Sequence, residues 1–178
     1  MNLQNHFILM SVYNQRMNRQ FYKVVKELND SDINEDRGAF FKSIIGTLNH
    51  ILVGDLIWLT RFSKHSERYT SLATLSDLPQ PKGLDDVLFS NLTLLLESRK
   101  KVDFLICQWL KNETKENDFN TLLEYSNTKG VVSKRDFGEL LSHLFNHQTH
   151  HRGQLSTLLN QLKLDVGVTD FLIEIPEN

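Results

Sequence analysis

The chain has 178 residues, of which 40% are hydrophobic and 24% charged, so we expect a packed core and exclude intrinsic disorder. Its 20 Lys and Arg residues face 22 Asp and Glu residues, and the resulting net charge of −2 provides no field for holding nucleic acid. The single cysteine, Cys107, excludes an internal disulfide and a multi-cysteine zinc site. No export signal or membrane-spanning run is visible, so we expect a cytoplasmic protein without nucleic-acid or membrane partners.

Apolar residues recur at helical spacing in four long segments, and all three prolines lie outside those segments. We predict helices over roughly residues 2–28, 39–62, 84–111 and 134–162. The second helix is expected to start near Gly38 or Ala39. Asp85 and Asp86 are expected in the first turn of the third helix, and Ser133 is expected to cap the fourth.

Two polar connections, over about residues 63–83 and 112–133, join the second helix to the third and the third to the fourth. The later connection has apolar residues on both sides of Asn127–Gly130, which suggests a short hairpin. Long helices with long links fit a four-helix bundle with crossover connections. We therefore predict an all-α fold in which residues 1–178 form a single domain.

Four of the seven histidines lie within nine residues of the last predicted helix: His143, His147, His150 and His151. On a helical wheel, His151 falls on the apolar stripe and His147 at its edge, whereas His143 and His150 lie on its flank. His147 and His151 are four residues apart, so their imidazoles can reach one ion. Two interpretations have equal weight: a shared metal ion, or two histidines hydrogen-bonded within the core.

His50 is the natural third ligand, because it lies mid-helix in the most apolar segment of the chain. His65 lies in a polar connection and is expected to be solvated, and His6 is either half-buried or frayed near the start of the first helix. Gly54 and Gly153 remove side chains where a helix or a ligand would need close approach. Simple helix packing explains these two glycines equally well.

Spacing excludes several other kinds of site. A ferritin-like di-iron centre needs Glu-x-x-His, and no glutamate lies three residues before any histidine. A zinc protease needs His-Glu-x-x-His, and here Gln148 follows His147. Cys107 lies in an apolar helical segment and is expected in the core rather than as a nucleophile. A heme between opposed histidines is disfavoured, because His147 and His151 share one helix face.

The segment 146–154 reads Asn-His-Gln-Thr-His-His-Arg-Gly-Gln and resembles the signature of the DinB family, Asn-His-x-x-His-His-Arg-Gly-Gln. Upstream, Leu-Asn-His at 48–50, followed by Asp55 and Trp58, resembles the first histidine of that family and its downstream tryptophan. The resemblance covers almost the whole chain. It implies a four-helix bundle, commonly a homodimer, that binds a divalent metal through three histidines.

Carried over position by position, the metal ligands of the family are His50, His147 and His151. Three neutral imidazoles leave an ion such as zinc or nickel with an open position for water or substrate. The resemblance implies a metal-dependent hydrolase or S-transferase that acts on a small molecule and uses a low-molecular-weight thiol. The alternative is a noncatalytic protein in which the ion is structural or a small ligand occupies the core.

Four further polar residues could orient the ligands or a substrate: His150, Asn146, Gln154 and Asp55. For any one of them, ordinary contacts at a helix surface or a dimer interface are the preferred explanation. Imidazole ligands suit zinc, nickel, copper and iron alike, so the residues leave the choice of metal open.

Overall fold

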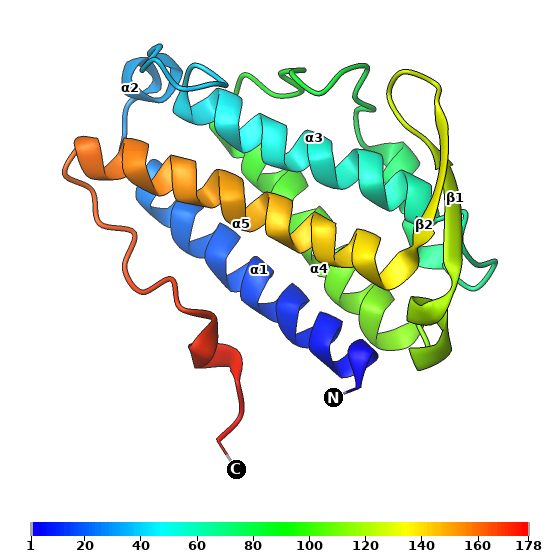
Figure 1. Ribbon diagram of the computed structural model, residues 1–178. Helices are drawn as coiled ribbons and strands as arrows, with labels where there is room; N and C mark the ends of the chain where they lie inside the picture. The colour runs from blue at the N-terminus through cyan, green and yellow to red at the C-terminus, as the bar shows by residue number, and fades with distance from the viewer. Residues whose placement is uncertain (1, 178) are drawn as a thin grey trace.

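The computed structural model describes residues 2–177, and within this range the chain is mostly helical with one two-stranded antiparallel sheet (Figure 1). The α-helices are α1 (Leu3–Val25), α2 (Asp30–Asn34), α3 (Ile44–Phe62), α4 (Leu92–Asn112) and α5 (Phe137–Gln161). Short 3-10 helices are η1 (Thr70–Asp77), η2 (Glu116–Asn120) and η3 (Phe171–Glu174), and the strands are β1 (Leu122–Ser126) and β2 (Val132–Asp136). The predicted helical character is therefore confirmed, with a small sheet added.

The long helices α1, α3, α4 and α5 pack along one another (Figure 1). α1 contacts α4 and α5, and α3 contacts α4 and α5, so each helix has two long neighbours. Their apolar stripes meet in one interior, where Phe62, Trp109 and Phe137 are fully buried. Each such side chain contributes about 1.5–3 kcal/mol through burial, so this interior dominates the stability of the fold.

The start of α3 differs from the prediction. The helix begins at Ile44 rather than near Ala39, because Lys42 has a left-handed backbone with φ of 63° and forms an isolated bridge with Ala39. Ser43 then caps the helix by accepting a hydrogen bond from a backbone N–H in the first turn. Phe40, which lies inside the predicted helix, is 85% exposed in the preceding turn.

The start of α4 was also predicted too early. The helix begins at Leu92, so neither Asp85 nor Asp86 lies in its first turn. Asp86 instead holds a turn in the connection, where its carboxylate accepts hydrogen bonds from the backbone N–H groups of Lys82 and Gly83.

The hairpin predicted in the second long connection is present. β1 pairs antiparallel with β2, with Leu122 opposite Asp136, and β2 runs directly into α5. Ser133 lies inside β2, so its predicted role as the cap of the last helix is wrong. Asp136 is the cap, and its side chain accepts a hydrogen bond from the backbone N–H of Glu139.

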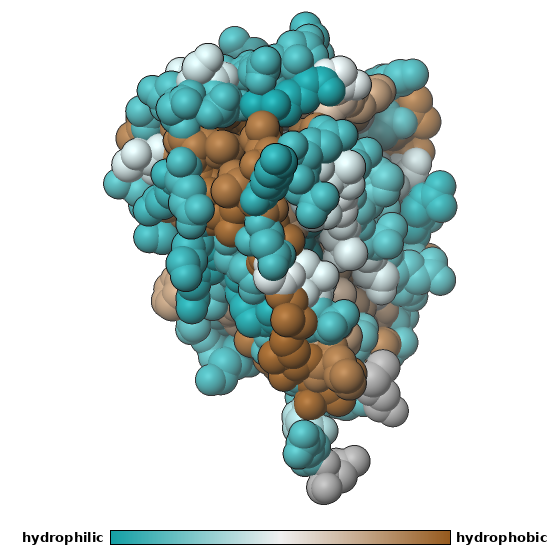
Figure 2. Space-filling view, turned by 90° about the vertical axis from the view of Figure 1, so that its left-hand side faces the viewer, coloured by the Kyte–Doolittle hydropathy of each residue, from teal (hydrophilic) through white to brown (hydrophobic). Residues whose placement is uncertain are grey.

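After α5 the chain returns along α1. The Tyr13 hydroxyl donates to the carbonyl of Thr169, and Arg16 forms an ion pair with Glu174. Leu172 and Ile173 of this tail are exposed. Figure 2 shows apolar side chains gathered at the lower end of the molecule. Among the helices of residues 2–177, none combines the length and the apolar character needed to cross a membrane.

Candidate metal centre

Three imidazoles converge between α3 and α5. The Nε2 atom of His50 lies 3.0 Å from that of His147 and 3.1 Å from that of His151. One ligand atom from each of the three rings lies within 4.8 Å of the others. Zinc–nitrogen bonds of about 2.0–2.1 Å separate two ligands of a tetrahedral ion by roughly 3.3 Å, so these nitrogens surround a space that fits one ion. The structure thus brings together the three residues predicted as ligands.

Hydrogen bonds on the far side of two rings fix which nitrogen carries the proton. Nδ1 of His50 lies 2.7 Å from the carbonyl oxygen of Leu84, and Nδ1 of His151 lies 2.8 Å from Oε1 of Gln154. Both oxygens only accept, so both Nδ1 atoms donate, and in a neutral ring Nε2 then carries a lone pair. The Nε2 atoms of His50 and His151 lie 3.1 Å apart, so their lone pairs repel one another, and a cation bound between them would relieve that repulsion, as in a metal site.

His147 fits closely against α3. A Cβ atom at Gly54 would lie 2.6 Å from Cε1 of the His147 ring, so only glycine admits the ring in this position. The predicted close approach at Gly54 is therefore present. At Gly153 a Cβ would meet no atom within 4 Å, so the same expectation is wrong there. Within the described part of the chain, the buried Nδ1 of His147 has no hydrogen-bond partner.

Burial keeps the three imidazoles neutral. Desolvation is the largest cause that lowers the pKa of each ring, and for His147 the pKa falls to about 3, with His151 and His50 contributing as neighbouring positive charges. A neutral imidazole presents the lone pair that a metal ion binds. The site is therefore ready to bind an ion at neutral pH without first losing protons.

A cleft of about 600 Å³ opens beside His50. The Phe41 ring stacks on the imidazole of His50, with centroids 3.7 Å apart and planes 17° from parallel. Much of the cleft wall is apolar, with Phe40 from the segment before α3 and Leu84 and Val87 from the segment before α4. Lys42 and Asp85 add one charge of each sign. Of the three histidines, His50 lines this cleft, so the cleft borders the histidine centre on that side.

Gln148 and Arg152, which directly follow His147 and His151, belong to a buried polar network. The Gln148 side chain donates a hydrogen bond of 2.6 Å to Asp55, and Asp55 also pairs with Arg99 of α4. The Arg152 guanidinium donates to Asn14 and Asn18 of α1. This network ties α5 to the other three long helices and so fixes the rotation that points His147 and His151 toward α3.

Of the four residues predicted to orient ligands or substrate, two contact the ring of His151: Gln154 through a hydrogen bond, and His150 edge-on with ring centroids 4.8 Å apart. Gln154 accepts from His151, and His150 contacts Gln154 at the exposed end of that chain. Asn146 is exposed and lines a different pocket, and Asp55 contacts the network instead of a histidine. Ordinary contacts at a helix surface, which the sequence analysis preferred for each of these residues, therefore do not describe Gln154 or the fully buried Asp55.

The remaining histidines are not part of the three-histidine cluster, although the ring centroid of His143 lies 6.3 Å from that of His147. His143 packs edge-on against Trp58, with ring centroids 5.2 Å apart. The prediction of a solvated His65 is wrong, because its ring stacks on Phe137 with centroids 4.1 Å apart. His6 is half-buried in α1. The contributions of Phe41 and of the Leu84 carbonyl had no signal in the sequence, because both come from irregular connections.

Comparison with known proteins agrees with these features. The profile of the DinB family matches residues 1–176. The chain is similar to Protein DinB of Bacillus subtilis (strain 168), with 27% identity over 161 residues that cover 89% of this chain and 87% of that protein. It is also similar to Uncharacterized protein YizA of the same organism, with 23% identity over 160 residues that cover 90% of each chain.

Proposed function

Because this chain belongs to the DinB family, we propose that it is a metal-dependent enzyme in which His50, His147 and His151 hold one divalent ion, zinc or nickel. The proposed reaction is hydrolysis or S-transfer on a small molecule, with a low-molecular-weight thiol as partner. The observation that carries the proposal is the convergence of three Nε2 atoms beside an accessible cleft. We also propose the four-helix bundle and the cytoplasmic homodimer that the family resemblance implies.

The residues around the centre support catalysis in distinct ways. Three imidazoles leave one position of a tetrahedral ion open, as catalytic sites do and structural sites do not. A bound ion would supply a Lewis acid that lowers the pKa of a water or thiol ligand toward neutrality. Leu84 and Gln154 keep two Nε2 atoms unprotonated, and Phe41 covers one face of His50 and excludes water from it.

The walls of the cleft indicate which substrates fit. Phe40, Leu84 and Val87 offer apolar contact, so part of the substrate is apolar. Lys42 and Asp85 line the same cleft with one charge of each sign, so the cleft offers polar contact to a charged group of the substrate. We therefore propose a substrate with one apolar and one charged end.

One observation favours a structural ion as the second candidate function. Asp55 is the acidic residue that resembles the family pattern near His50, but it is fully buried and paired with Arg99 and Gln148. It is therefore not available as a general base. In this alternative the ion links α3 to α5 and no reaction occurs at it.

Metal content of purified variants tests the centre. We expect one equivalent of metal in the wild-type protein and less than one tenth of that in His50→Ala, His147→Ala and His151→Ala. His6→Ala is the control, because it removes a half-buried imidazole of α1 that lies outside the centre, and it should keep the metal. Unchanged occupancy in all three ligand variants would refute the proposal.

Cobalt substitution separates the two candidate functions. If one position of the ion is open, adding a small thiol such as 2-mercaptoethanol should change the visible spectrum of the cobalt-loaded protein. A spectrum that does not respond to thiol, together with a lower melting temperature after chelation, would support a structural ion. Turnover of thiol-acceptor or ester substrates by the zinc-loaded or nickel-loaded protein would support the enzyme.

A further inference from the structure

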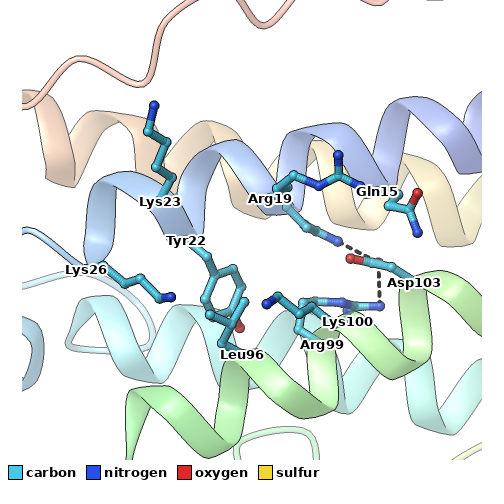
Figure 3. Close-up of a pocket in the computed structure, with 10 residues that line it drawn as sticks. Gln15, Arg19, Tyr22, Lys23, Lys26, Leu96, Arg99, Lys100 and Asp103 are labelled. Carbon is cyan, nitrogen blue, oxygen red and sulfur yellow. Dashed lines mark hydrogen bonds and ion pairs between the residues drawn. The ribbon is translucent and has the colours of Figure 1, made fainter.

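A second cavity, of about 390 Å³, lies between α1 and α4, and none of the histidine ligands lines it (Figure 3). Its volume falls in the range of about 300–1,000 Å³ that is usual for small-molecule sites. Four exposed cations surround it: Arg19, Lys23 and Lys26 from α1, and Lys100 from α4. In a chain with a net charge of −2, this is a local concentration of positive charge.

These four cations have no internal counter-charge. Within residues 2–177, none of them forms an ion pair with a carboxylate. The acid in the cavity wall, Asp103, is buried and pairs with the buried Arg99, which also pairs with Asp55. One guanidinium faces two carboxylates there, so this buried group leaves at most one negative charge against the four outer cations, which remain in excess and can attract an anion.

The floor of the cavity holds a polar group that lacks a partner. Tyr22 is 1% exposed, and within the described residues its hydroxyl forms no hydrogen bond. Burial raises the pKa of this hydroxyl, so it keeps its proton and can donate. In Figure 3 the amino groups of Lys26 and Lys100 point toward the Tyr22 ring from two sides, whereas Lys23 points away. Lys26, Lys100 and Tyr22 thus line one cavity, with the Tyr22 hydroxyl buried at its base.

We propose that this cavity binds a small organic molecule through a phosphate monoester, which Lys26, Lys100 and the Tyr22 hydroxyl hold. A tetrahedral phosphate accepts hydrogen bonds from several directions and carries up to two negative charges, which matches donors on opposite sides of one space. The Leu96 side chain and the Tyr22 ring offer apolar contact to the organic part. The site is separate from the histidine centre and does not depend on the proposed function.

Phenyl phosphate is the probe that tests this site, by calorimetry at constant ionic strength. We expect saturable binding of one molecule per chain, and at least tenfold weaker binding of benzoate, which has a planar anionic group. The double variant Lys26→Gln/Lys100→Gln should weaken phenyl phosphate binding at least tenfold. The matched control Lys101→Gln/Lys111→Gln removes the same charge from exposed positions of α4 outside the cavity and should change the affinity less than twofold.

Tyr22→Phe separates a role in binding from a role in folding. Because the hydroxyl has no partner in the protein, its loss should leave the melting temperature of the ligand-free protein unchanged or higher, while phenyl phosphate binds severalfold more weakly. His50→Ala should bind phenyl phosphate like the wild type, since the two sites are separate. Absence of saturable binding, or equal affinity in the two double variants, would overturn the proposal.

Discussion

Gly54→Ala is the most informative single change at the histidine centre. Gly54 lies one turn after His50 on α3 and faces the ring of His147 on α5. An added Cβ would lie 2.6 Å from Cε1 of that ring, whereas non-bonded carbons rest about 3.5–4.0 Å apart. The ring must therefore move by about 1 Å, which takes its Nε2 away from that of His50.

Two opposing effects set the stability of the variant without metal. Alanine in a helix interior is favoured over glycine by about 1 kcal/mol, and overpacking a core position costs about 1–3 kcal/mol. We therefore expect the metal-free protein to lose between about 0 and 2 kcal/mol. Metal affinity should fall much further, because ligand distances tolerate only about 0.2 Å. Loss of a partner that merely orients a ligand costs about 10–100-fold, so displacing the ligand itself should cost at least ~100-fold.

Zinc titration against a competing chelator measures this loss, and urea unfolding with excess chelator measures the stability. Gly153→Ala is the matched control, because it makes the same change on α5 where a Cβ meets no atom within 4 Å. That variant should bind zinc like the wild type and be more stable by up to about 1 kcal/mol. If Gly54→Ala binds zinc as tightly as Gly153→Ala, the inference that glycine admits the His147 ring is wrong.

Three further outcomes follow from contacts around the centre. Gln154→Leu removes the acceptor of His151 Nδ1 and should weaken zinc binding about 10–100-fold, whereas Gln154→Glu keeps an acceptor and should recover most of the affinity in the same titration. Arg99→Met leaves the buried Asp55 without its cation and should lower the free energy of unfolding by about 3–5 kcal/mol in urea, and a loss below about 1 kcal/mol would contradict a buried ion pair. Burial lowers the pKa of His147 to about 3, so the unfolded chain binds more protons. This shift should lower the free energy of unfolding of the metal-free protein as the pH falls below about 6.5, whereas the buried Asp103, whose pKa is raised to about 6, contributes in the opposite direction. In urea titrations with chelator between about pH 7.5 and 5.0, the wild type should lose stability relative to His147→Gln, and the absence of that difference would contradict the shift.

Local spacing was sufficient to predict much of the centre. His147 and His151 lie four residues apart on a helix, so their shared direction follows from helix geometry alone. His50 was found by the apolar character of its neighbours, which indicates a buried segment. At Gly54 the sequence leaves close approach of a helix or ligand and simple helix packing equally open, and the structure shows close approach of the His147 ring.

The helix starts could not be predicted in the same way, because they depend on contacts between distant residues. The segment before α4 is apolar enough to form a helix. The Asn49 side chain, however, donates to the carbonyl of Phe89 and accepts from its N–H, and these two hydrogen bonds hold the segment in a non-helical conformation. This turn also places the carbonyl of Leu84 against His50. Local periodicity carries no information on such a contact, so the role of Leu84 was missed together with the start of α4.

Two kinds of residue on α5 contact α3: the metal-ligand candidates His147 and His151, and the hydrogen-bond donor Gln148. Gly54 and Asp55 are adjacent on α3, and they face His147 and Gln148, which are adjacent on α5. Because the hydrogen bond from Gln148 to Asp55 sets the rotation of α5, it also sets how closely the His147 ring approaches Gly54. His151 lies one turn later and meets His50, one turn earlier on α3, so a single antiparallel alignment of the two helices positions all three imidazoles (Figure 1). A buried polar contact between neighbouring residues thus determines the geometry of the centre without touching any of its nitrogen atoms.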